Sequence, residues 1–209
     1  TAYRLASLFV DDTPLFDSVV VVTDRRVLDS QLQETISGFD HAIGSVVTIG
    51  KDKTSADLRD AINGGARLIV STLQKFPVIY EQVESEGKRF AIIVDEAQFL
   101  TREEVMYLVH LVDDCGIPVM CYGLRADFKN NFFEGSQWLM AWADTIEEIK
   151  TICWCGRKAT CNARGVDGRV VQEGEQVVLG GNGQYVSLCR KHFRRGELGD
   201  FKDLHLGEE

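Results

Sequence analysis

The feature that most constrains this chain is one apolar run that ends in two adjacent carboxylates. Residues 90–94 read Phe-Ala-Ile-Ile-Val, and Asp95 and Glu96 follow directly. An apolar run bounded by polar residues predicts a strand buried on both faces, as in a parallel sheet. Because α/β folds place ligands at the carboxyl ends of such strands, this pair is a candidate for Mg²⁺ binding and proton transfer. The alternative is a polar strand end without chemistry.

The first part of the chain alternates between predicted strands and predicted helices. A capping box of Thr101 and Glu104 marks one helix start. Alternation of this kind predicts an α/β fold with a parallel sheet and helices on both faces. The predicted strands are 18–22, 46–49, 67–72, 90–94 and 117–122, and the predicted helices are 2–10, 23–36, 54–63, one after Pro77, and 101–114.

The pattern changes near Glu147, where glycine becomes frequent and cysteines occur in pairs. Short β-like runs are predicted at 150–153, 169–171, 176–179 and 185–188. We therefore predict an α/β domain over 1–148, a small β domain over 149–196, and a loosely ordered acidic tail over 197–209.

Two short-spaced ligand pairs lie in the predicted β domain. Cys153 and Cys155 form the first pair, on a predicted hairpin, and Cys189 and His192 form the second. Two such pairs joined by a loop match the needs of a closed tetrahedral Zn²⁺ site. The alternative is unrelated thiols and an exposed histidine. The remaining cysteines lack partners at ligand spacing: Cys115 and Cys121 are predicted core residues, and Cys161 is left open.

Charge and composition exclude some classes of function. The 23 Lys and Arg residues against 32 Asp and Glu residues give a net charge of −9, which disfavours non-specific nucleic-acid binding. No apolar run is long enough to span a membrane, and no signal-peptide pattern opens the chain. We therefore expect a cytoplasmic protein with reduced cysteines and no membrane partner.

The sequence from Val94 onward resembles bacterial type II thymidine kinase. The matching segments are 95–101 (DEAQFLT), 118–128 (PVMCYGLRADF), 151–159 (TICWCGRKA) and 173–192 (EGEQVVLGGNGQYVSLCRKH). This resemblance implies that Glu96 activates the thymidine 5′-hydroxyl, that Asp95 serves Mg²⁺, and that Asp95, Glu96, Ala97 and Gln98 lie beside ATP. It implies a homotetramer and structural zinc on Cys153, Cys155, Cys189 and His192.

The same resemblance implies a lasso loop over 178–185 that closes on the thymine base. The expected base-binding residues are Phe99, Leu124, Phe128, Phe133, Val178, Gly180 and Tyr185. The residues themselves agree, since aromatic side chains suit a flat base. The glycines at 180, 181 and 183 allow close backbone approach to a ligand, although a plain β-hairpin turn explains them equally well.

The sequence before Val94 resembles a different family, the RecA-like motor domain of type I restriction enzyme R subunits. The matching segments are 16–32, 53–61, 65–76 and 88–97. Both families imply a RecA-like, P-loop-type sheet, so a chimera joined inside the strand at 90–94 is one interpretation. The alternatives to a thymidine kinase are therefore a fragment of a DNA-translocating ATPase and an inactive fusion. The sequence contains no G-x-x-x-x-G-K-[ST] phosphate-binding motif, and we expect that loop to belong upstream of Thr1.

Overall fold

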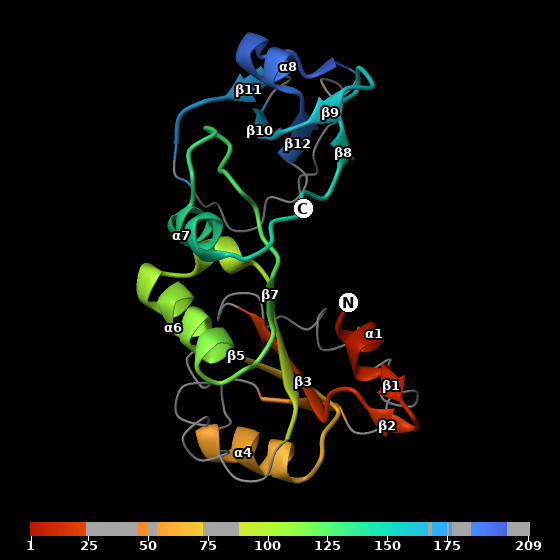
Figure 1. Cartoon of the computed structure of the whole chain (residues 1–209). Coiled ribbons are helices and arrows are strands. Elements are labelled where there is room, and N and C mark those ends of the chain that lie inside the picture. Colours follow the sequence, from red (N-terminus) through yellow and green to blue (C-terminus); the bar gives the residue numbers. More distant parts are fainter. Residues whose placement is uncertain are drawn as a thin grey trace. The chain divides into compact units, whose positions relative to one another are not determined.

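The chain folds into two compact units, Thr1–Gly123 and Leu124–Glu209, which are described separately (Figure 1). The computed structural model describes residues 1–23, 46–49, 54–72, 88–166, 169–174, 176 and 185–199. The predicted helices at 23–36 and after Pro77 lie outside these residues, apart from Thr23, and so does most of the predicted strand 176–179. The predicted boundary after residue 148 falls within the second unit and stays a prediction.

In the part of the chain that the structure describes, the first unit is built on a five-stranded parallel sheet. Its strand order is β4 (Val46–Thr48), β5 (Leu68–Thr72), β3 (Ser18–Thr23), β6 (Phe90–Val94) and β7 (Val119–Cys121). Strand β3 lies at the centre, with Val20 opposite Ile69 on one side and Ile92 on the other. All five strands fall where the sequence predicts them, because continuous apolar runs are what a doubly covered parallel sheet requires.

Helices cover both faces of this sheet. Val19 and Val21 of β3 pack in one cluster with Ala6 of α1 (Ala2–Ala6). Because side chains alternate along a strand, Val20 and Val22 point to the opposite face, and both are fully buried. Helices α4 (Ser55–Asn63) and α6 (Arg102–Asp113) also bury apolar side chains. The predicted α/β sheet with helices on both faces is therefore confirmed.

The helix predicted at 2–10 is too long. Helix α1 ends at Ala6, and β1 (Phe9–Val10) pairs with β2 (Thr13–Pro14) in an antiparallel hairpin. The turn between them places Asp11 and Asp12 at φ values of 48° and 61°. Aspartate tolerates this left-handed conformation better than most residues, so the local turn chemistry ends the helix early.

The described residues of the second unit form two small antiparallel sheets. Strands β8 (Thr151–Ile152) and β9 (Lys158–Ala159) form a hairpin, and the order β11 (Arg169–Val171), β10 (Cys161–Val166), β12 (Tyr185–Leu188) forms the other sheet. Helices α7 (Glu134–Trp142) and α8 (Arg190–Arg195) belong to the same unit.

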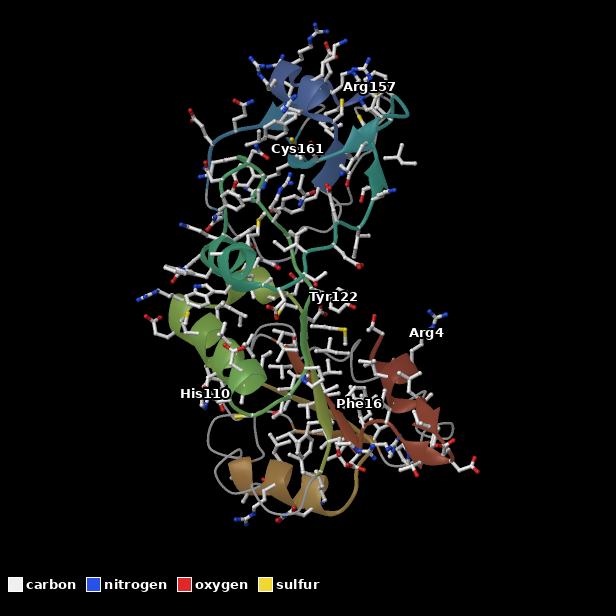
Figure 2. All side chains as sticks on the ribbon, in the orientation of Figure 1. Arg4, Phe16, His110, Tyr122, Arg157 and Cys161 are labelled. Carbon is white, nitrogen blue, oxygen red and sulfur yellow. The ribbon has the colours of Figure 1, made fainter. Side chains whose placement is uncertain are left out.

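The core of the second unit joins its strands to its last described residues. Cys161 begins β10 and is 7% exposed, so it is a core residue (Figure 2). The same cluster contains Leu188, Phe193 and Leu198. Leu198 lies within the segment predicted as a loose tail, yet it is 4% exposed. Among the described residues, no helix is long and apolar enough to cross a membrane.

Candidate functional site

The carboxylates at the end of β6 are held between the ends of two neighbouring strands. The Asp95 N–H donates to the Val22 carbonyl at 2.9 Å, and the Ala97 N–H donates to the Tyr122 carbonyl at 2.8 Å. Glu96 lies between them with φ at 52°, in the left-handed region. A glutamate is rarely found there, and such strain concentrates at functional sites. The two strands therefore fix the backbone of the predicted catalytic pair.

The Glu96 carboxylate is oriented by a buried amide. The Gln98 side-chain N–H₂ donates to Glu96 Oε2, and Gln98 is only 2% exposed within the 3₁₀ helix η2 (Ala97–Phe99). The Glu96 N–H donates to Asp95 Oδ1 at 3.0 Å. Two carboxylates thus stand at the carboxyl end of a parallel strand with one of them fixed in orientation. This arrangement suits proton abstraction beside an oxygen-ligated divalent cation.

Gly123 lies against the backbone of the same loop. A Cβ at this position would lie 2.6 Å from Gln98 Oε1 and 2.9 Å from the Gln98 N. We expect Gly123→Ala to destabilise the first unit by about 1–3 kcal/mol, because the loop backbone must shift. Urea unfolding followed by circular dichroism measures this change. Gly64→Ala is the comparison variant, since its Cβ would contact the Asp60 carbonyl at 3.0 Å at the end of α4, away from this loop. A Gly123→Ala chain that is as stable as the parent chain would contradict the expected steric clash.

The candidate base-binding residues of the second unit differ in exposure. Phe128 and Phe133 are buried, at 1% and 7% exposure, whereas Leu124 is 45% exposed. Asp127 holds the turn between them, since its Oδ1 accepts the N–H groups of Lys129 and Asn131 at 2.9 and 2.8 Å.

The remaining candidates for the base site are distributed over the chain. Tyr185 is partly buried at the start of β12. Phe99 is partly buried and belongs to the first unit. Val178 and Gly180 lie outside the described residues. The structure therefore describes five of the seven predicted base-binding residues, and their grouping around a base stays a prediction.

The four predicted metal ligands come together in the second unit. One ligand atom from each of Cys153, Cys155, Cys189 and His192 lies within 4.8 Å of the others. Cys153 Sγ is 3.4 Å from His192 Nδ1, and Cys155 Sγ is 4.0 Å from Cys189 Sγ. His192 is 7% exposed, so the alternative of an exposed histidine is wrong. Three thiols and one imidazole at these spacings fit a closed tetrahedral metal site.

Local backbone structure positions both ligand pairs. The first pair lies in the β8–β9 turn, where the Cys153 N–H donates to the Arg157 carbonyl and the Gly156 N–H to the Cys153 carbonyl, both at 2.8 Å. Gly156 has φ at 79°, which favours glycine. The second pair opens α8, with Cys189 at its N-cap. The pKa of the Cys189 thiol is lowered chiefly because the His192 backbone N–H faces its sulfur, which favours the thiolate that binds metal.

A further layer of contacts surrounds the metal ligands. The Trp154 ring stacks on the His192 ring, with centroids 4.3 Å apart and an interplanar angle of 11°. His192 Nε2 faces the Glu197 carboxylate at 3.6 Å. The Trp154 indole N–H donates to the Glu197 carbonyl at 3.3 Å. Since Nε2 faces a carboxylate, Nδ1 is the nitrogen left for a metal, and carboxylates commonly orient a ligating histidine in this way.

The predicted core cysteines of the first unit behave as structural residues. Burial raises the pKa of the Cys121 thiol to about 12. A thiol of that kind stays protonated at neutral pH and is a poor metal ligand and nucleophile. Cys115 is partly buried. Neither belongs to the metal group found among the described residues.

A comparison with protein-family models identifies the family of this chain. Residues 30–193, which are most of the chain, match the thymidine kinase family model. The chain belongs to the thymidine kinase family. The match begins well before Val94, where the resemblance in the motifs starts, so it includes part of the segment that resembles a restriction-enzyme motor. A chimeric origin for this thymidine kinase family chain stays a prediction.

Curated relatives support the same assignment. A thymidine kinase from Legionella pneumophila (strain Lens) is 51% identical over 124 residues, covering 58% of this chain and 59% of that protein. A thymidine kinase from Salmonella typhimurium is 52% identical over 135 residues, covering 61% and 66%. One from Escherichia coli O157:H7 is 52% identical over 136 residues with the same coverage. This chain thus spans about three fifths to two thirds of the length of these thymidine kinases.

Sequence reasoning missed several residues that the structure places around the candidate sites. Arg164, Trp154 and Glu197 are not among the predicted site residues, and each contacts one of them. The adjacency of Trp154 to two cysteines was a usable signal for Trp154. Arg164 and Glu197 carried no comparable signal.

Proposed function

We propose that this chain transfers the γ-phosphate of ATP to the 5′-hydroxyl of thymidine. The observation that carries the proposal is the Asp95–Glu96 pair at the carboxyl end of β6, in a chain that belongs to the thymidine kinase family. Phosphoryl transfer needs a group that accepts the hydroxyl proton and a group that binds the metal on the phosphates. Two adjacent carboxylates supply both functions at one place.

In this proposal Glu96 is the general base. Its carboxylate accepts the proton of the 5′-hydroxyl, while Gln98 holds the carboxylate in orientation through its amide. Asp95 would hold Mg²⁺, which would supply positive charge to the phosphate oxygens of ATP. Ala97 and Gln98 complete the nucleotide contact. The backbone strain at Glu96 is offset by the hydrogen bonds that the neighbouring Asp95 and Ala97 N–H groups donate to the Val22 and Tyr122 carbonyls.

The thymine base is proposed to contact Phe99, Leu124, Phe128, Phe133 and Tyr185, together with backbone groups near Val178 and Gly180. The four aromatic side chains in this set suit a flat ring, since they offer large apolar area with little loss of side-chain entropy. A base held by backbone groups is recognised through its polar edge, which gives selectivity among pyrimidines.

The Cys153, Cys155, Cys189 and His192 group is proposed to bind one structural Zn²⁺. Four protein ligands leave no open coordination position, which distinguishes a structural site from a catalytic one. The metal would join the β8–β9 hairpin to α8 and support β12, the strand that begins with Tyr185.

The proposed activity is tested by incubating the purified chain with radiolabelled ATP, Mg²⁺ and thymidine and measuring labelled thymidine monophosphate. Thymidine should also raise the melting temperature of the chain. A rise with double-stranded DNA and none with thymidine would favour a DNA-translocating ATPase instead. Thymidine binding without phosphate transfer would contradict the proposed activity and leave a nucleoside-binding fusion.

A further inference from the structure

One buried arginine joins two of the proposed base-binding residues. Arg164 lies on β10 opposite Tyr185 of β12, and it is only 6% exposed. Its Nη2 donates to the Tyr185 hydroxyl at 2.9 Å. Its guanidinium carbon lies 3.7 Å from the centroid of the Phe128 ring and 5.5 Å from that of the Tyr185 ring. The arginine therefore contacts one aromatic ring face-on and the hydroxyl of the other.

The turn that carries Phe128 is also tied to the chain just before residue 177. Gln176 Nε2 donates to Asp127 Oδ2 at 3.0 Å, and Lys129 Nζ donates to the Gly174 carbonyl at 2.9 Å. Residues 174 and 176 precede the proposed lasso segment, and Tyr185 ends it. Contacts from the 127–129 turn and from Arg164 therefore connect Gly174, Gln176 and Tyr185 to the same part of the second unit.

The chemistry of this contact requires an arginine. A planar guanidinium stacks on an aromatic face and still donates hydrogen bonds in its own plane. A lysine ammonium is a strongly hydrated point charge that cannot do both. Burying a cation costs desolvation free energy, so a fully buried position needs aromatic and hydrogen-bonding partners of this kind. The Phe128 ring contacts the guanidinium, and the Tyr185 hydroxyl accepts from its Nη2.

We propose that Arg164 is a positioning residue for the thymine site. It fixes the Phe128 ring and the Tyr185 ring relative to one another, and so sets the spacing that a base must fit. The inference rests on the proposed function, because Phe128 and Tyr185 matter in this way only if they bind the base. Arg164 acts through those two rings and has no role in proton or phosphate transfer.

The test compares thymidine and ATP binding in Arg164→Met and Arg164→Lys by isothermal titration calorimetry, with kcat and KM from the transfer assay. Both variants should lose about 10- to 100-fold in thymidine affinity, the range expected for a lost buried cation–π contact and a charged hydrogen bond. The loss should appear in KM for thymidine, with KM for ATP unchanged. Arg169→Met is the matched control, because Arg169 is an exposed arginine on β11 of the same sheet; it should bind like the parent chain.

A second variant keeps the test decisive if Arg164→Met fails to fold. Tyr185→Phe keeps the ring and removes the hydroxyl that Arg164 contacts, so it should weaken thymidine binding several-fold while ATP binding stays unchanged. Combined with Arg164→Lys, its effect should be less than additive, since both remove the same contact. If Arg164→Lys and Tyr185→Phe both bind thymidine within twofold of the parent chain, the positioning role of Arg164 is wrong. That outcome leaves the proposed function intact. A parent chain that does not bind thymidine would overturn the proposed function and this inference together.

Discussion

Glu96→Gln is expected to lower kcat for thymidine phosphorylation by about 10²- to 10⁴-fold, the usual contribution of a general base. The substitution keeps the size of the side chain and removes only its capacity to take the hydroxyl proton. Glutamine also offers an oxygen to the Gln98 amide, so the contact that orients residue 96 is retained. Thymidine and ATP affinities should therefore stay close to those of the parent chain.

The comparison variant for this experiment is Glu103→Gln. Glu103 is an exposed carboxylate in the first turn of α6, a few residues after Glu96 and outside the loop that follows β6. The Glu103→Gln substitution removes the same charge outside the proposed site, so the kcat of this variant should equal that of the parent chain. A Glu96→Gln variant with full kcat would show that another group accepts the proton.

Cys189→Ala is expected to remove one bound zinc per chain and to unfold the second unit at ordinary temperature. Structural zinc in small domains contributes about 10–16 kcal/mol of apparent binding free energy at pH 7, which is also folding free energy. A site with three remaining ligands keeps only part of this free energy. Native mass spectrometry measures the metal content, and the loss of near-ultraviolet circular dichroism reports the loss of packing around Trp154, which stacks on His192.

Cys161→Ala separates the metal from the general effect of losing a buried cysteine. Cys161 lies in the same core as Cys189 and is likewise buried, but it is outside the ligand group. It should retain one zinc and lose only about 1–2 kcal/mol of stability through the missing sulfur atom. Metal content near zero in the parent chain, or a full complement in Cys189→Ala, would contradict the zinc assignment.

The sheet of the first unit could be predicted from sequence because its strands are buried on both faces. Continuous runs such as 18–22 and 90–94 have no competing interpretation of similar strength. The structure of chain ends and turns was harder to predict from the sequence than the sheet. The hydrophobic spacing of Leu5, Leu8 and Phe9 indicated one helix, yet a turn at Asp11 and Asp12 directs Phe9 into a hairpin. Hydrophobic spacing does not report the backbone conformation of two aspartates.

The candidate sites likewise consist of residues that can be predicted from the sequence and contacts that cannot. Metal ligands at short spacing and carboxylates at a strand end carry their own sequence signatures, and the structure brings the four metal ligands together. The contacts that orient them depend on partners far away in sequence. Arg164 and Phe128 are 36 positions apart in numbering (164 − 128) and meet only after β10 and the turn at 127–129 are in place. Neither residue type nor spacing distinguishes such an arginine from an exposed one.

The metal ligands also have a consequence for the topology of the chain. Cys155 and Cys189 are 34 residues apart, so a metal between them closes a loop that contains the whole proposed lasso segment, much as a covalent cross-link does. The entropy of closing a loop grows slowly with its length, by about 0.6 kcal/mol for each doubling. Once the ends are joined, residues can be added to or removed from the middle at little thermodynamic cost. A change in the length of the loop between Cys155 and Cys189 is therefore expected to cost little stability as long as the proposed metal stays bound.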